Sequence, residues 1–586
     1  MSIPFPDQPR ASIAGVTSHL LDAFRAQETA KYVAARPRCR AALDAGAAPW
    51  LNGVPMHWMR DWPSPFPLVV KKAKDARLID IDGHKLDDFC LGDTGSMFGH
   101  SPPAVARAIR RQARRGLTYM LPSQAALKAG AAVMDITPTQ FPVNMPGGHT
   151  GNLATGVHDP LNARALVLDD GKTKVVWVVI DHLSVPRKVT VEAKEIASKA
   201  TGIPVENMLV SATHTHTGVS AADEFVVEVA GGPKLSDRQV KANVYRQVML
   251  DGISQSIIKA HAQLRPALVG AAAQPLPSEV FNRRWYLKPG KMPLNPFGEM
   301  DKVKMNPGTS PDVIDRPAGP TDPDVSILSV QDAKRKPLAL FANYSLHYVG
   351  GSPGGQVSAD YYGEFARVMP SRLRAGDDFV AAMSNGTSGD INNIPFGVTR
   401  PPREPFEQIR LVASEAADAS WNAYQAIGKH QGDVVLGMRQ RTLTLKYRKP
   451  TAEQVMNAKA ILAIKDKEAI ARLPALAKNY AGSTIAAAER PEETLDIIVQ
   501  VIKVGDIVLC AIPFETFAET GLELKKKSPF GRTIVVGLGN GRHGYLPTPA
   551  QHELGGYETW LGTSTVQKDA SEIVVRNLVE MMGELK

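Results

Sequence analysis

Two histidines with a single residue between them follow a short apolar run. Residues 207–218 are Asn-Met-Leu-Val-Ser-Ala-Thr-His-Thr-His-Thr-Gly, a pattern typical of a β-strand that runs out into a loop. The period of two along such a strand places His214 and His216 on the same side. Because neutral imidazole is a common metal ligand and a base near neutral pH, this pair indicates a metal ion, or a proton shuttle beside one. Strand-end histidines that simply satisfy their hydrogen bonds are the alternative.

The stretch 212–218 resembles the Thr-His-Thr-His-Ser-Gly signature of the neutral/alkaline ceramidase family. Other pieces of that family's pattern occur in the family's order along the chain, and this collinearity makes the resemblance specific. The pieces are Asp-Ile-Thr-Pro at 135–138, His-Asp-Pro-Leu-Asn-Ala-Arg-Ala at 158–165, Asn-Arg at 282–283, Asn-Tyr-Ser-Leu-His at 343–347, the stretch 384–393, Pro-Phe-Glu at 513–515 and Gly-Tyr-Leu-Pro-Thr at 544–548.

The resemblance implies a zinc site and a hydrolytic reaction. The positions that match the family's metal ligands are His214, His347, Glu515 and Tyr545. A site of two imidazoles, a carboxylate and a phenol leaves room for a water that the metal activates. The implied catalytic residues are His216 as proton shuttle to the leaving amine, with Arg283 and Asn392 as donors to the oxyanion.

Two of these positions combine a family match with an argument from the side chain. Arg283 has a fixed charge and forked donors that suit an oxyanion, and a structural ion pair is its alternative role. Asn392 stands where the family has an essential serine, and Phe514 replaces a glycine of the family's Pro-Gly-Glu motif. An asparagine amide can donate a hydrogen bond to a carbonyl oxygen, but it cannot act as a nucleophile.

Three further residues are predicted to line the site. His158 follows a glycine-rich loop and precedes a strand, while Asp360 lies in a stretch, 358–362, that also matches the family. Asp181 follows the predicted strand 174–180. Because ligands gather where the strands of an α/β sheet end, Asp181 is predicted to orient one of the histidines as a hydrogen-bond acceptor. Capping of a surface helix is its alternative role.

The first part of the chain has a different character. Residues 1–124 resemble the N-terminal part of class III pyridoxal-phosphate-dependent aminotransferases of the glutamate-1-semialdehyde aminomutase type, through the stretches 80–84, 88–93 and 99–105. The pattern predicts a helix over 17–43, strands at 68–73, 77–82 and 86–91 with a turn at Asp82-Gly83, and a helix over 101–115. The resemblance stops before the cofactor domain, so the segment is predicted to be a non-catalytic packing or oligomer-contact element, or a remnant of gene fusion.

The domain prediction is therefore an aminotransferase-like segment at 1–126 and a ceramidase-like zinc hydrolase domain at 127–586. In the second part, strands at 163–168 and 174–180, a helix over 189–201 and the strand before His214 form a βαβ pattern. A long helix over 236–264 and a proline- and glycine-rich rim at 288–323 follow. The predicted fold class is α/β, with mixed β-sheets and flanking helices like a ceramidase catalytic domain, preceded by a small α+β segment.

Composition narrows the class of protein further. The chain has 586 residues, and its 68 basic and 59 acidic side chains give a formal charge of +9, which is too dilute to indicate nucleic-acid binding. Three distant cysteines, Cys39, Cys90 and Cys510, offer no disulfide framework, which favours a reducing compartment. No signal peptide or transmembrane segment is recognisable, so a cytoplasmic location is expected, although the resembled enzymes are often secreted.

The sequence thus favours a zinc-dependent hydrolase that uses metal-activated water to cleave an N-acyl amide, such as a ceramide-like lipid amide. The expected partners are a small-molecule or lipid amide substrate and, through residues 1–124, a second copy of the chain. The alternatives are a protein related to the pyridoxal-phosphate-dependent aminotransferases, or an inactive fusion or binding protein.

Overall fold

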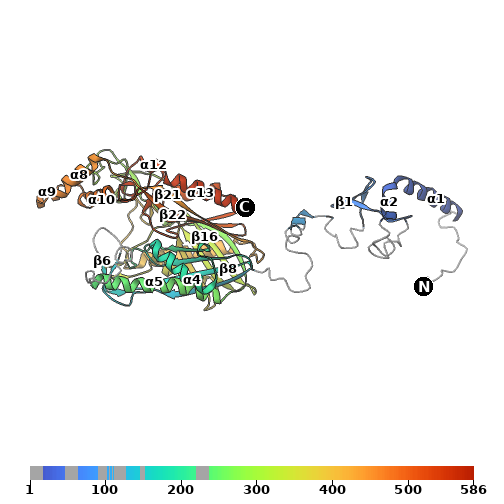
Figure 1. Ribbon diagram of the computed structural model, residues 1–586, viewed down its shortest axis with the longest axis horizontal. Helices are drawn as coiled ribbons and strands as arrows, with labels where there is room; N and C mark the ends of the chain where they lie inside the picture. The colour runs from blue at the N-terminus through green and yellow to red at the C-terminus, as the bar shows by residue number, and fades with distance from the viewer. Residues whose placement is uncertain are drawn as a thin grey trace. The chain divides into compact units, whose positions relative to one another are not determined.

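The computed structural model describes residues 18–45, 64–89, 127–145, 152–219 and 237–586, with single positions between residues 100 and 110. The chain divides into two compact units, Met1–Ser123 and Gln124–Lys586 (Figure 1).

The first unit contains two helices and a three-stranded antiparallel sheet. These elements are α1 (Ser18–Ala35), α2 (Pro37–Ala45), β1 (Val70–Lys74), β2 (Arg77–Asp80) and β3 (Lys85–Asp87). Pro37 suits the first turn of α2, where no backbone N–H is required. The Asp82 carboxylate in the β2–β3 turn accepts hydrogen bonds from the backbone of Arg38 and Cys39 at 2.8 and 2.7 Å, which caps α2. The predicted turn is confirmed, and most of the predicted helix at 101–115 lies outside the described residues.

The second unit is built on an eight-stranded mixed sheet, in which β10–β9 and β17–β19 are parallel and the other neighbours are antiparallel. In spatial order its strands are β10 (Met208–Ala212), β9 (Lys174–Ile180), β8 (Asn162–Asp169), β4 (Lys128–Asp135), β11 (Arg265–Pro275), β16 (Asp324–Asp332), β17 (Pro337–Tyr344) and β19 (Val380–Asn385). A second sheet is ordered β21 (Leu436–Lys446), β22 (Thr494–Val504), β23 (Ile507–Ile512) and β25 (Arg532–Gly537).

The two sheets pack face to face because their strands alternate apolar side chains between two buried faces. One face of the large sheet meets the small sheet in a cluster that includes Trp177, Phe341 and Leu509. The next residues along the same strands, such as Val178 and Leu340, point the other way and pack against helices. This double burial explains why these strands are almost wholly apolar rather than amphipathic.

Helices cover the outer faces of both sheets. The large sheet is covered by α4 (Arg187–Thr201), α5 (Asp237–Ala262), α6 (Asp360–Leu373) and α7 (Glu407–Gln425), and the small sheet by α11 (Ala518–Lys527) and α13 (Ala570–Leu585). Figure 1 shows the strands between α4 and α5 on one side and α13 on the other. This layered arrangement confirms the predicted α/β class with mixed sheets and flanking helices. No helix within the described residues combines the length and apolar character needed to span a bilayer.

The connections carry shorter elements. The helices are α8 (Ala452–Ala463), α9 (Lys467–Ala471), α10 (Ala477–Glu489) and α12 (Pro549–His552). The paired strands are β5 (Val143–Met145) with β6 (Asn152–Ala154), β7 (Gly156–Val157) with β18 (Gln356–Val357), β12 (Phe281–Asn282) with β20 (Ile391–Asn392), β13 (Arg284–Leu287) with β14 (Lys304–Met305) and β15 (Ile314–Pro317), and β24 (Glu515–Thr516) with β26 (Tyr545–Leu546). The predicted rim at 288–323 therefore contains two strands of a small sheet.

Candidate metal centre

Residues from both sheets meet where several strands end. His214 follows β10, His347 follows β17, Glu515 lies just after β23, and Tyr545 lies in β26 after β25. The backbone joins these ends, since the amide of Ala212 at the end of β10 donates to the carbonyl oxygen of Leu538 after β25. The fold thus delivers side chains that are far apart in the sequence to one place.

Three imidazoles form the core of this place. Nε2 of His214 lies 3.0 Å from Nε2 of His347 and 3.3 Å from Nε2 of His216. The ring of His214 is perpendicular to both of its neighbours, at 90° and 89°. Among the described residues, these three histidines are the group whose nitrogens all lie within 4.8 Å of one another, close enough to share one metal ion. With Glu515 they are called the histidine centre below.

Glu515 completes the centre with a carboxylate. Its Oε2 lies 3.2 Å from Nε2 of His214 and 3.8 Å from Nε2 of His347, and this buried oxygen has no hydrogen-bond partner. Burial alone would raise the pKa of Glu515, but the neighbouring His214 ring, a hydrogen bond from the Tyr545 hydroxyl and the charge of Arg283 lower it to about 2. The carboxylate is therefore ionised at neutral pH.

The other ring nitrogens of two histidines fix their orientation. Nδ1 of His214 lies 2.8 Å from the carbonyl oxygen of Leu183, and Nδ1 of His347 lies 3.0 Å from that of Ser388. A carbonyl oxygen only accepts, so each Nδ1 carries the hydrogen and each Nε2 presents its lone pair to the centre. Burial lowers the pKa of His347 and His216, which favours their neutral forms.

This arrangement fits a bound cation. Two imidazole lone pairs and an ionised carboxylate oxygen point at one another without a donor between them, and buried acceptors normally have a partner. Imidazole nitrogen and carboxylate oxygen are the ligands that zinc takes in catalytic sites. The donor set therefore fits a zinc ion.

The two neighbouring histidines converge for a reason that the sequence analysis did not give. The expectation of a strand with period two is wrong here, because β10 ends at Ala212. His214 instead adopts a left-handed backbone conformation with φ 76°, while its amide donates to the carbonyl oxygen of His182 at 2.9 Å. The side chains of His214 and His216 therefore meet through a turn that departs from the strand geometry.

Arg283 and Tyr545 lie beside the histidine centre. Nη2 of Arg283 donates to the Tyr545 hydroxyl at 3.1 Å, and its Nε donates to Oε1 of Glu558 at 2.8 Å. Burial and the neighbouring Glu515 carboxylate raise the pKa of Tyr545, so its hydroxyl keeps its proton. Arg283 therefore forms the buried ion pair considered for it and also faces the phenol beside the centre, while its role as donor to an oxyanion stays a prediction.

Two predicted residues are held away from their expected roles. Oδ2 of Asp181 accepts from Arg164 Nη1 at 2.6 Å and from the backbone of Asn162 at 2.9 Å, and Oδ1 has no hydrogen-bond partner. The predicted role of Asp181 as acceptor for a histidine is therefore wrong, as is the surface capping role, because the buried arginine takes this carboxylate. Asn392 donates through Nδ2 to Oδ1 of Asn306 at 2.5 Å and accepts from the backbone of Ile394 at 2.9 Å. Both polar atoms of its amide are therefore taken by these two partners.

The remaining predicted residues surround the centre without joining it. The ring of His158 stacks on Phe406 with centroids 3.4 Å apart, and no contact among the described residues connects it to the histidine centre. Asp360 is buried and accepts from the backbone of Val349 and Gly350 at 3.0 and 2.9 Å, which shapes the turn after His347. Asp360 therefore supports a predicted ligand through the backbone.

Sequence reasoning missed three residues beside the centre. Tyr348 stacks on His216 with centroids 3.8 Å apart, Tyr557 packs edge-on against Tyr545 at 5.7 Å, and Glu558 binds Arg283. Tyr348 directly follows a predicted ligand, and this adjacency was the available signal. Tyr557 and Glu558 lie in a short 3-10 turn with no periodic pattern, so the local sequence gave no comparable signal.

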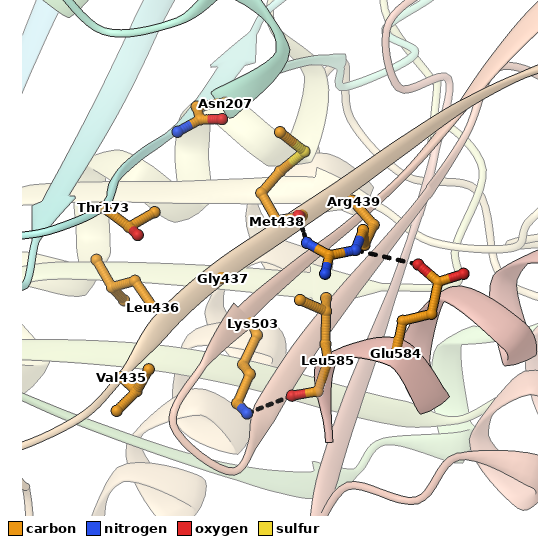
Figure 2. A pocket seen from close by; sticks show the side chains of 10 residues that line it. All are labelled: Thr173, Asn207, Val435, Leu436, Gly437, Met438, Arg439, Lys503, Glu584 and Leu585. Carbon is orange, nitrogen blue, oxygen red and sulfur yellow. Dashed lines mark hydrogen bonds and ion pairs between the residues drawn. The ribbon is translucent and has the colours of Figure 1, made fainter. Parts of the chain in front are cut away.

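A surface cavity of about 430 Å³ lies elsewhere, between β21, the end of α13 and the loops around Thr173 and Asn207 (Figure 2). None of the predicted site residues lines it. Its charged groups are paired, since Arg439 binds Glu584 at 3.0 Å and Lys503 donates to the carbonyl oxygen of Leu585. This cavity offers none of the chemistry of the histidine centre.

The fold and the site thus define a mixed α/β protein with a candidate metal centre at the strand ends. Residues 127–398 match the family model of the neutral/alkaline non-lysosomal ceramidase, N-terminal. The resemblance to the neutral/alkaline ceramidase family is thereby confirmed for this part of the chain.

Individual relatives agree with that assignment. A neutral ceramidase of Oryza sativa subsp. japonica is 27% identical over 248 residues, which are 41% of this chain and 28% of the rice protein. Neutral ceramidase A of Dictyostelium discoideum is 23% identical over 51% of this chain and 40% of its own length. The chain therefore matches less than half the length of these curated relatives. The crystal structure of neutral ceramidase from Pseudomonas aeruginosa shares the fold, with a TM-score of 0.58 at 17% identity over 79% of this chain and 74% of that chain.

The aminotransferase-like resemblance is also confirmed, over a much shorter stretch. Glutamate-1-semialdehyde 2,1-aminomutase of Thermoplasma acidophilum is 38% identical over 76 residues, which are 13% of this chain and 17% of the aminomutase. The match therefore covers one short segment of the aminomutase, and most of the aminomutase sequence lies outside it.

Proposed function

We propose that the second unit is a zinc-dependent amidohydrolase that cleaves the amide bond of an N-acylated, ceramide-like lipid. One observation carries this proposal: the Nε2 lone pairs of His214 and His347 and the unpartnered Oε2 of Glu515 face one another at 3.0 to 3.8 Å. The names of the relatives, which are neutral ceramidases, supply the substrate class.

The proposed ligands of the zinc ion are His214, His347, Glu515 and Tyr545, with His216 within reach of the same position. When bound, such an ion supplies Lewis-acid chemistry that polarises a carbonyl group and acidifies water.

The residues around the centre have separate tasks in this proposal. The guanidinium of Arg283 donates to Glu558 and, through Nη2 at 2.8 Å, to the carbonyl oxygen of Gly389. These hydrogen bonds fix the position of its positive charge. A fixed cation beside the scissile amide would stabilise negative charge on the acyl oxygen as it forms. His216 is the proposed proton carrier, since a neutral imidazole can accept a proton at Nε2 and pass it to the leaving amine.

The proposal is tested by measuring metal content and amide hydrolysis on the same preparations. Wild-type protein, His347→Ala and Glu515→Ala are analysed for zinc per chain and assayed with a short-chain fluorescent ceramide. His158→Ala is the matched control, because its ring stacks on Phe406 away from the centre. We expect about one zinc per chain and hydrolysis in the wild type and the control, and loss of both in the two ligand variants.

Two results would count against the proposal. Wild-type protein that remains folded but takes up no zinc would refute the metal centre. Zinc uptake without hydrolysis of any N-acyl amide would refute the reaction while leaving the centre in place.

A further inference from the structure

The three histidines of the centre are not held in the same way. Nδ1 of His214 and Nδ1 of His347 each donate to a backbone carbonyl oxygen, at 2.8 and 3.0 Å. For His216, the polar contact found among the described residues is through Nε2, which lies 3.3 Å from Nε2 of His214. Among the residues whose side chains the structure describes, no acceptor is found for its other ring nitrogen. A ring without that tether is free to turn about its Cβ–Cγ bond unless packing prevents it.

Packing against Tyr348 supplies the missing restraint. The rings of His216 and Tyr348 are stacked with centroids 3.8 Å apart and planes inclined by 17°. Turning the imidazole out of this plane would drive its edge into the phenol ring. A flat contact of this kind fixes ring orientation in a way that an aliphatic side chain cannot.

The position of Tyr348 is restrained by the turn that follows it. The buried carboxylate of Asp360 accepts from the backbone of Val349 and Gly350, which fixes the turn directly after Tyr348. Gly350 has φ 73°, and a Cβ atom at this position would lie 3.1 Å from Cε2 of Tyr348. The phenol ring therefore lies between the imidazole of His216 and a glycine that leaves it just enough room.

We propose that Tyr348 is a positioning residue for the metal centre, because its ring holds Nε2 of His216 beside the other two imidazoles in place of a backbone acceptor. The inference rests on the metal centre of the proposed function and is independent of the amide substrate. It predicts that the flat ring is required and that the hydroxyl group is dispensable.

The test is a double-mutant cycle between Tyr348 and His216. For each variant, the Co²⁺ affinity and the visible absorption spectrum of the Co²⁺-bound protein are measured. Because Nε2 of His216 lies within reach of the same ion as His214 and His347, Tyr348→Ala should weaken Co²⁺ binding by about 10- to 100-fold, as loss of the groups that orient metal ligands commonly does. Tyr348→Phe should bind Co²⁺ as the wild type does, with the same spectrum. Tyr447→Ala, which truncates a tyrosine that stacks on Arg490 far along the sequence, is the matched control and should also resemble the wild type.

The cycle is closed with His216→Ala and the double variant. If Tyr348 acts through His216, Tyr348→Ala should cause no further loss in the His216→Ala background. An equal loss in both backgrounds, or no loss in either, would overturn the proposal. Gly350→Ala provides a second route, since its methyl group displaces the Tyr348 ring without removing it. An unchanged Co²⁺ affinity and spectrum in that variant would also overturn the proposal.

The same measurements separate this inference from the proposed function. Co²⁺ binding by the wild type without amide hydrolysis would refute the amidohydrolase reaction and leave the cycle readable. Failure of the folded wild type to bind Co²⁺ would refute the metal centre and the role of Tyr348 together.

Discussion

Two buried polar regions of the second unit meet at Tyr545 and differ in how their charges are paired. In the first, which we call the arginine–glutamate network, Glu558 lies fully buried between Arg283 and Arg284 and accepts from them at 2.8 and 2.7 Å. The other donors of Arg284 go to the side chain and backbone of Gln551 and to the backbone of Gly555. In the second region, the histidine centre, acceptors face acceptors.

This difference distinguishes buried charges that are paired within the protein from buried groups that are available to bind a ligand. Burying an ion is costly unless its partners are present, and the arginine–glutamate network contains those partners within the protein. In the histidine centre His214 and His347 are also buried, yet their Nε2 lone pairs and Oε2 of Glu515 lack a donor. The fold thus satisfies one buried site within the protein and gives the adjacent one the donor set of a cation site.

The largest expected effect comes from breaking the satisfied network. Glu558→Gln removes the charge that both arginines share, so two buried guanidinium groups lose their ionic partner. We expect a loss of about 3 to 5 kcal/mol in the free energy of unfolding, measured by urea denaturation. The matched control is Glu553→Gln, because Glu553 and Lys568 form an exposed pair, and it should change stability by less than about 1 kcal/mol. Equal losses in the two variants would contradict the distinction.

The histidine centre should respond to metal instead. Adding zinc to metal-free wild-type protein, at a free concentration about 100 times the dissociation constant, should raise the free energy of unfolding by about 2.7 kcal/mol. His347→Ala should lose this gain, and His158→Ala should keep it. Urea unfolding with and without zinc measures the effect. A gain in the His347→Ala variant as large as in the wild type would locate the binding elsewhere.

Lys194 is an intermediate case, a buried cation with a neutral partner. Its Nζ donates to Oδ1 of Asn540 at 2.5 Å, and burial lowers its pKa from 10.5 to about 7. Between these two values the unfolded chain binds more protons than the folded one, so this group makes the free energy of unfolding rise with pH. The full penalty applies below pH 7. The slope approaches about 1.4 kcal/mol per pH unit within the window.

The pH dependence is isolated by comparing Lys194→Met with the wild type at pH 7.5, 8.5 and 9.5. The unfolding free energy of Lys194→Met minus that of the wild type should fall as pH rises, because only the wild type gains stability from deprotonation of Lys194. Lys188→Met, at an exposed position of the same helix, should keep a constant difference. A constant difference for Lys194→Met as well would show that this lysine is charged in the folded protein at every pH tested.

The contrast between the two regions also explains what the sequence could predict. The strands of the large sheet were visible in runs such as 174–180, because burial on both faces demands continuous apolar residues. His214 was visible from its motif, but its meeting with His347 depends on two strand ends brought together by sheet order, which no local pattern encodes. The resemblance to a known family supplied that pairing.

Predictions failed where a residue on another element of the fold bound the side chain. Asp181 follows a strand as a site residue would, but Arg164 on the neighbouring strand binds its carboxylate. Glu558 binds Arg283 across 275 positions of the chain, and a lone glutamate in a short turn gives no sign of such a partner. Local sequence therefore indicates which residue types could do chemistry, and tertiary contacts decide which of them remain available.

Asn392 provides the smallest and most discriminating test of that last step. In the structure its amide is bonded to Asn306 and to the backbone of Ile394, so Asn392→Ala should leave zinc content unchanged. Because two side-chain hydrogen bonds are lost, each worth about 0.5 to 1.5 kcal/mol, it should destabilise the fold by about 1 to 3 kcal/mol. If hydrolysis is also retained, oxyanion stabilisation rests on Arg283. A fall in turnover of about 100- to 1,000-fold at full zinc content, the cost typical of losing an oxyanion donor, would mean that Asn392 leaves Asn306 when substrate binds.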